Sequence, residues 1–214
     1  MGWKSAVSAF ALAVIALPLA ASPAAAQTYG FLRLGNATYD DDPFCEDPTA
    51  LITMFSLGFS TPLIGVTAEY NSGDYPWPPP NESATGVFLT HGHALQVMAE
   101  FNPVHLISRG ISEYARPYVA AGLHISSDGE SRADTGAGEA WGVGGQTKPF
   151  VAFGVNGILP VGPRLGLTAG YRHTTVFFGD FDLITPGGPV QTVDGDSRSS
   201  SSVSVGLTFL LGNN

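Results

Sequence analysis

Eight segments of about ten residues, in which apolar side chains alternate with small or polar ones, follow one another after residue 28. Alternation with a period of two places the apolar side chains on one face of an extended strand. About ten residues is also the length that a tilted strand needs to cross a lipid bilayer. The segments are Tyr29–Ala37, Ala50–Phe59, Leu63–Tyr70, Gly92–Asn102, Pro117–Ile125, Pro149–Gly157, Arg164–His173 and Ser201–Leu211.

The connectors between these segments alternate between long and short. Long loops at one rim and shorter turns at the other are the plan of an outer-membrane β-barrel. One connector, Pro103–Arg116, is long for the short-turn rim, and we expect it to contain a strand extension or a short helical turn. The long connectors are Asp40–Thr49, Asn71–His91, Ser126–Lys148 and Thr174–Ser200.

The two faces of the strands differ in a way that indicates which one points inward. Charged residues make up only 13% of the chain, about half of the ~25% usual in soluble domains. A soluble lipocalin-like calyx would expose the less apolar faces to water, although they are rich in glycine and poor in charge. A membrane barrel turns these small residues into its narrow interior. The sequence therefore favours an all-β, eight-stranded antiparallel up-and-down transmembrane β-barrel, with the calyx as an alternative.

Four charged residues lie on the predicted inward faces of four different strands. They are Arg33, Glu69, Glu100 and Arg172. Counted from the short-turn ends of the strands, their order in depth is Glu100, Arg33, Glu69 and Arg172, so the signs alternate. An isolated charge in a narrow lumen would cost several kcal/mol. We therefore expect these two acids and two bases to form a lumen charge network.

Aromatic residues are predicted at both ends of the membrane-spanning segments. Tyr70 and Tyr171 fall at the outer ends, whereas Phe59, Phe101 and Phe209 fall at the inner ends. Rings at these heights are typical of the two aromatic girdles at the membrane–water interfaces.

Residues 1–26 have the pattern of a cleaved secretory signal peptide. Lys4 precedes an apolar run, and the small residues Ala24–Ala26 precede Gln27. A single membrane-anchor helix is the alternative, but the run is short and contains Pro18. We expect residues 27–214 to form one β-barrel domain.

The acidic residues gather in the predicted long loops, which hold 15 acidic and three basic residues. With a formal net charge of −9 for the whole chain, a nucleic acid is not an expected partner, because phosphate binding needs a basic face. The acidic rim is expected to face the outside of the cell.

Four segments resemble the later strands of small eight-stranded outer-membrane barrels of the OmpA-transmembrane, OmpX and opacity-protein type: Ala115–Gly122, Lys148–Gly154, Leu167–Arg172 and Ser202–Phe209. The last segment looks like the family's C-terminal insertion signal, although Leu210 and Leu211 follow Phe209. The resemblance implies a Gram-negative-type outer membrane and recognition of the C-terminal strand by the barrel-assembly machinery. Outer-membrane lipids and lipopolysaccharide are the other expected partners.

Some barrels of this kind modify lipid A, and His124-Ile125-Ser126 with Glu130 has a superficially similar spacing of histidine, serine and acid. A catalytic serine–histidine pair must meet its substrate, and His124 is predicted to face the lumen. The acidic cluster of Asp40–Asp42, Glu46 and Asp47 lacks the spacing of a calcium loop. We expect no catalytic residues, no metal site and no cofactor, and a structural or surface-interaction role. A lipid A-modifying barrel enzyme is the alternative.

Overall fold

The computed structural model describes residues 28–39, 52–77, 88–108, 114–126, 129–132, 140–143, 147–177, 181–184, 191–193 and 197–211. The predicted signal peptide at 1–26 and the acidic cluster at 40–47 lie outside these residues. Within the described residues, no helix is both long and apolar enough to cross a membrane.

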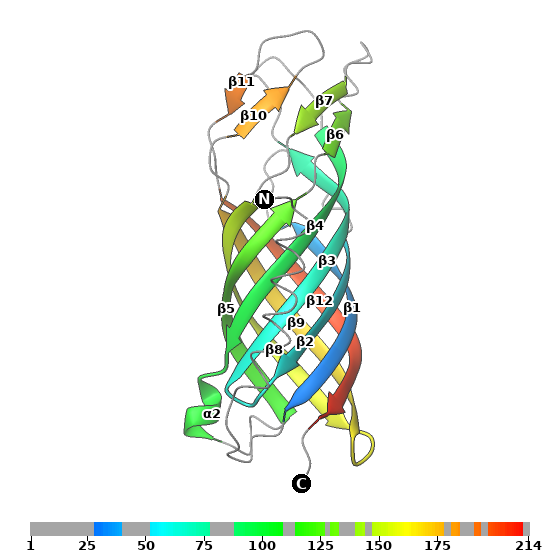
Figure 1. Cartoon of the computed structure of the whole chain (residues 1–214), viewed down its shortest axis with the longest axis vertical. Helices are drawn as coiled ribbons and strands as arrows, with labels where there is room; N and C mark the ends of the chain where they lie inside the picture. Colours follow the sequence, from blue (N-terminus) through cyan, green and yellow to red (C-terminus); the bar gives the residue numbers. More distant parts are fainter. Residues whose placement is uncertain are drawn as a thin grey trace, which may run out of the picture.

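Eight long antiparallel strands form a closed barrel, which confirms the predicted fold class (Figure 1). Around the wall the strands run in the order β4-β3-β2-β1-β12-β9-β8-β5, and the pairing of β4 with β5 closes the circle. The strands are β1 (Tyr29–Tyr39), β2 (Ile52–Ser60), β3 (Ile64–Trp77), β4 (Phe88–Phe101), β5 (Ala115–Ser126), β8 (Thr147–Pro160), β9 (Leu165–Phe177) and β12 (Ser197–Leu210).

Several strands extend farther than the alternating pattern predicted. The sequence placed the end of the third segment at Tyr70, but β3 continues to Trp77, paired with β4 from Phe88 onward. Likewise β9 continues to Phe177 and pairs with the start of β12 at Ser197. The antiparallel pairing of the backbones continues here, although apolar side chains no longer alternate with polar ones. Parts of the predicted long loops are therefore strand.

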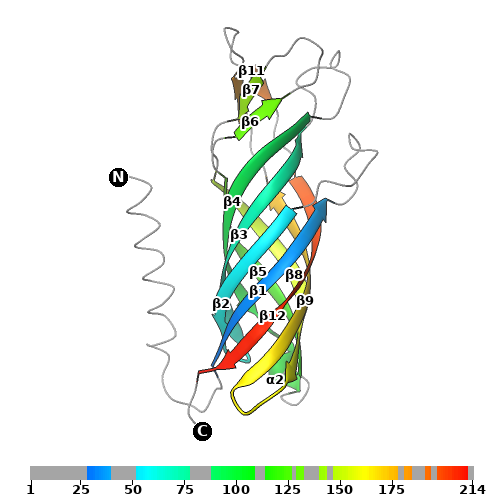
Figure 2. The ribbon, with the colours of Figure 1, turned by 90° about the vertical axis from the view of Figure 1, so that its right-hand side faces the viewer.

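Four short strands at the long-loop end were also interpreted as loop from the sequence. They pair in series, with β6 linking the start of β4 to β7, and β10 linking β7 to β11 (Figures 1 and 2). Their bounds are β6 (Gly129–Arg132), β7 (Ala140–Val143), β10 (Phe181–Ile184) and β11 (Gln191–Val193).

The opposite, short-turn end carries three connectors: 61–63, 102–114, of which the structure describes 102–108 and 114, and 161–164. The second of these contains α2 (Val104–Ile107), a single helical turn. The expectation of a short helical turn between Pro103 and Arg116 is thereby confirmed, and β5 begins at Ala115, two residues before the predicted strand start at Pro117.

The burial of side chains confirms the predicted faces of the strands. On β3, Glu69 is 3% exposed and its neighbour Tyr70 is 47% exposed. The same alternation around the barrel leaves an apolar belt on the outside and buries polar residues inside. Exposed large members of the apolar belt are Leu32, Leu34, Phe55, Leu57, Ile64, Tyr70, Phe101, Val119, Leu123, Val151, Phe153, Val155, Leu165, Leu167, Tyr171, Val203, Val205, Leu207 and Phe209.

The upper edge of the apolar belt follows the register of the strands. The outward residues Asn36, Thr53, Ser72 and His93 are successive register partners across β1, β2, β3 and β4. Between β1 and β12 the edge moves up by two residues, because Asn36 pairs with Val203 of the apolar belt; there Ser201 and its partner His173 on β9 belong to the polar ring. Because the strands extend beyond the ring, the barrel wall is taller than its apolar belt.

Candidate functional site

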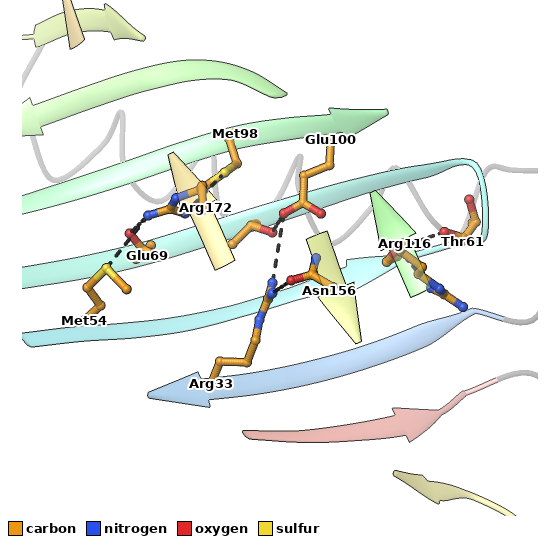
Figure 3. A network of polar contacts seen from close by, with 11 residues as sticks. Arg33, Met54, Thr61, Glu69, Met98, Glu100, Arg116, Asn156 and Arg172 are labelled. Atoms are coloured by element: carbon orange, nitrogen blue, oxygen red, sulfur yellow. Dashed lines mark hydrogen bonds and ion pairs between the residues drawn. The ribbon is translucent and has the colours of Figure 1, made fainter. Parts of the chain in front are cut away.

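The four predicted charges all lie in the barrel interior, and the structure brings them together in two pairs (Figure 3). Arg33 is on β1, Glu69 on β3, Glu100 on β4 and Arg172 on β9, and all four side chains are buried. Each pair joins strands that are not neighbours in the sheet, so its members meet across the lumen. The sequence predicted the depth order Glu100, Arg33, Glu69, Arg172. Each pair joins two residues that are next to each other in this order.

The first pair consists of Arg172 and Glu69. The guanidinium Nη2 of Arg172 donates a hydrogen bond to Oε1 of Glu69. The thioether sulfurs of Met98 and Met54 lie 3.6 Å and 3.9 Å from the guanidinium nitrogens. Sulfur is only a weak acceptor, so the carboxylate of Glu69 is the principal counter-charge of this arginine.

The second pair, Arg33 and Glu100, is looser and shares its charges with other groups. The distance between Nη2 of Arg33 and Oε1 of Glu100 is 4.0 Å. Arg33 also donates to Asn156 Oδ1 and its guanidinium lies 4.0 Å from the centre of the Phe31 ring. Glu100 accepts a further hydrogen bond from the hydroxyl of Thr67. Each member of this pair therefore has a further polar or cation–π contact besides the one with its counter-charge.

A fifth charged residue, Arg116, also lies in the lumen, where the sequence did not place it. It was assigned to the short-turn connector because the strand was predicted to begin at Pro117, but β5 begins two residues earlier. Its side chain is buried, with Nη1 3.4 Å from Ser60 Oγ and the guanidinium 4.2 Å from the centre of the Tyr29 ring. The described lumen therefore contains at least three arginines and two glutamates, rather than a balanced set of four.

Three interior aromatic rings cover glycines of adjacent strands. Phe31 lies opposite Gly58, Tyr118 opposite Gly154, and Phe150 opposite Gly122 in the register. A side chain on any of these glycines would meet the ring or the neighbouring backbone. The sequence did not reveal these contacts, because an aromatic ring and its glycine are brought together only by the register of two strands.

We expect Gly154→Ala to lower the free energy of unfolding by about 1–3 kcal/mol, the usual cost of overpacking. The new Cβ atom would lie 2.5 Å from the carbonyl oxygen of Tyr171 and 2.8 Å from Cζ of Tyr118. Gly157→Ala in the same strand is the matched control, since its Cβ atom would meet only the carbonyl oxygen of Ala169 at 3.6 Å. Urea unfolding in lipid vesicles measures both, and equal stabilities of the two variants would contradict this packing.

Small cavities lie between the interior side chains near the short-turn end. Two cavities of about 20 Å³ each lie toward the short-turn end, and both are lined in part by Ser60, Glu100, Arg116 and Asn156. A volume of this size holds about one water molecule. Farther from that end, Phe150 and Met98 are each only 1% exposed and belong to an apolar cluster within the barrel.

The five predicted interfacial aromatics lie at the two edges of the apolar belt. Phe101 ends β4, and Phe59 and Phe209 are each one residue from the short-turn end of their strands. Tyr70 and Tyr171 lie at the upper edge, although their strands continue past them, so they do not end the strands as predicted. The hydroxyl of Tyr70 is 2.8 Å from His93 Nδ1 and that of Tyr171 is 3.2 Å from Ser201 Oγ. Both hydroxyls thus contact the polar ring.

Solved structures resemble this chain over most of its length. A major outer membrane protein from Thermus thermophilus is 10% identical, with a TM-score of 0.52, covering 85% of this chain and 98% of its own. The chain has the fold of the outer-membrane β-barrels. Outer membrane protein AlkL, solved in lipid bilayers, is 13% identical with a TM-score of 0.48, covering 91% and 94%. Neisserial surface protein A is 16% identical with a TM-score of 0.45, covering 86% and 97%. No protein-family model matches the sequence, and no curated protein is significantly similar to it.

The histidine considered for catalysis is buried inside this barrel. His124 lies on β5 and its Nδ1 is 3.0 Å from Nε2 of Gln96 on β4. Ser126 follows at the end of β5, and the Glu130 side chain lies outside the described part of the structure. Among the described residues, no group of three His, Cys, Asp or Glu side chains is arranged to hold a metal ion.

Proposed function

We propose that this chain is a non-enzymatic barrel of a Gram-negative-type outer membrane, with its short-turn end in the periplasm and its acidic long loops outside. Its role is structural or surface-interacting. The observation that carries the proposal is the inverted burial of side chains: the paired charges lie inside, and the large apolar residues of the belt lie outside.

This inversion supports lipid, rather than water, as the medium around the barrel wall. Single apolar residues on a protein surface are normal, but a soluble protein seldom exposes a contiguous apolar patch beyond a few hundred Å². The apolar belt contains 19 exposed large apolar residues from all eight long strands. A soluble calyx has the reverse arrangement, with an apolar interior around its ligand.

Two further features support the orientation and the non-enzymatic role: the lengths of the connectors and the burial of His124. Long loops on the outer side and short turns on the periplasmic side are usual in such barrels. The lipids and lipopolysaccharide of the outer membrane are the partners of the apolar belt, and the barrel-assembly machinery is the partner of β12, the C-terminal strand. The burial of His124 beside Gln96 supports a structural role for this histidine over a catalytic one.

Fractionation of cells that produce the chain tests this proposal. We expect the chain in the outer membrane, extractable only with detergent, and migrating differently on gels before and after boiling, because the closed barrel persists until heated. Lipid A from the same membranes is expected to have an unchanged mass spectrum when compared with cells that lack the chain. A soluble chain would overturn the membrane location, and a changed acyl pattern would overturn the non-enzymatic role.

We also expect no steady ion conduction across planar bilayers. The interior of an eight-stranded barrel is just wide enough to be filled by side chains, and here Phe150 and Met98 lie within it with almost no exposed surface. Single-channel recording of the purified, refolded chain makes the measurement, with a large porin as the positive control. Long-lived open currents of uniform size would show that the lumen is a pore.

A further inference from the structure

The short helix α2 exposes apolar side chains at the periplasmic, short-turn end of the barrel. Leu106 is 68% exposed and Ile107 is 86% exposed, and Tyr114 beyond the helix is 59% exposed. None of the residues of α2 is buried. These side chains therefore contribute little to the stability of the fold by packing against the barrel.

The position of α2 is nevertheless fixed by a buried polar residue, Asn102. Its side-chain Nδ2 donates to the carbonyl oxygen of Pro62 at 3.0 Å, and its Oδ1 accepts from the backbone N–H of Val104 at 3.1 Å. Its own backbone N–H donates to the carbonyl oxygen of Leu63 at 2.8 Å. One residue thus ties the start of the helix to the turn between β2 and β3, so the direction of α2 is set by the fold.

This direction carries α2 to the side of the barrel wall. The helix lies beside the lower end of β5, at the level of the strand ends and away from the barrel axis (Figure 1). The connector that contains it begins directly after Phe101, and β5 presents Val119 farther up; both side chains belong to the apolar belt. The exposed side of α2 therefore continues the apolar belt at its lower edge.

We propose that α2 is an interfacial anchor that binds the lipid surface of the periplasmic leaflet. Leu106 and Ile107 enter the boundary between headgroups and acyl chains, where apolar side chains of interfacial helices are buried. The anchor rests on the proposed function, because it requires the apolar belt to lie in the bilayer with its lower edge beside α2. Since the anchor lies on one side of the barrel, it favours one depth and one tilt of the barrel in the bilayer.

Spin labelling of the full mature chain in phosphatidylethanolamine–phosphatidylglycerol vesicles tests the anchor. The sequence has a single cysteine, so Cys45→Ser provides a background for one label at a time. The three sites are Ile107→Cys on α2, Val205→Cys in the apolar belt, and Ser197→Cys on the exposed part of β12 beyond the belt. Power saturation then compares the accessibility of each label to oxygen, which partitions into lipid, and to a nickel chelate, which stays in water.

We expect the oxygen-to-nickel accessibility ratio at Ile107→Cys to be several-fold higher than at Ser197→Cys and lower than at Val205→Cys. Adding Leu106→Ser is expected to bring the ratio at position 107 toward that of Ser197→Cys, whereas Leu106→Met keeps it high. These side chains are exposed, so the variants leave the barrel intact.

The other outcomes separate the anchor from the proposed function. A water-like ratio at Ile107→Cys with a lipid-like ratio at Val205→Cys overturns the anchor alone. A water-like ratio at Val205→Cys overturns the membrane barrel itself. An immobilised label at position 107 with dipolar broadening would show a second copy of the chain on α2, and an immobilised label without broadening would show that α2 packs against its own barrel; either result overturns a lipid anchor.

Discussion

Glu69→Gln is expected to lower the free energy of unfolding by about 3–5 kcal/mol, the usual cost of removing one partner of a buried ion pair. An arginine guanidinium stays protonated in proteins, so Arg172 keeps its positive charge in this variant. Without the carboxylate, its surroundings in the lumen include the weakly accepting thioethers of Met54 and Met98. A glutamine amide of similar shape can accept a hydrogen bond but supplies no counter-charge. The loss is therefore electrostatic rather than one of packing.

Urea unfolding in lipid vesicles measures this loss, and the chain supplies a matched control. Glu100→Gln should cost less, because Arg33 keeps its hydrogen bond to Asn156 and its contact with Phe31. A second test combines Glu69→Gln with Arg172→Met. The double variant should lose at least about 1 kcal/mol less than the sum of the two single variants, because residues in direct contact couple. Equal costs for the two glutamine variants, or strict additivity, would contradict the pairing.

The faces of the strands could be predicted from the sequence because two different media select the side chains. In the proposed membrane barrel, lipid selects apolar residues such as Leu207 and Phe209 at every second position, and the narrow interior selects small or polar ones such as Gly206 and Thr208. This contrast disappears above the apolar belt, where residues of either face meet water or other polar groups. The ends of β3, β9 and β12 were missed for that reason.

The contacts within the lumen depend on geometry that a linear pattern does not contain. Alternation indicates that Glu69 and Arg172 both point inward, but their contact crosses the lumen between β3 and β9, which are not paired. It therefore follows only from barrel closure and strand stagger. Arg116 was missed for a local reason, since a proline at position 117 was taken as the start of the strand. The role of Asn102 depends on the turn between β2 and β3, which is remote in the sequence.

The side chains of the apolar belt offer a test that distinguishes lipid from water around the barrel. Val205 lies on the outward face of β12 and is 65% exposed, so its replacement disturbs little packing. In a bilayer, Val205→Lys should lower the free energy of unfolding by about 2–4 kcal/mol, the cost of lysine near the midplane of a membrane barrel. In a water-soluble calyx the same change would stay within about 0.5 kcal/mol, as surface substitutions usually do.

The matched control for Val205→Lys is Thr38→Lys on the neighbouring strand β1. Thr38 is also exposed and points outward, but its register partner is Ser201 in the polar ring at the upper edge of the apolar belt. A lysine at this height reaches the headgroups, so Thr38→Lys should cost at most about 1 kcal/mol. Urea unfolding in vesicles measures both variants. Equal and small losses would mean that Val205 faces water, whereas the expected difference follows from depth alone, because the two changes introduce the same charge on adjacent strands.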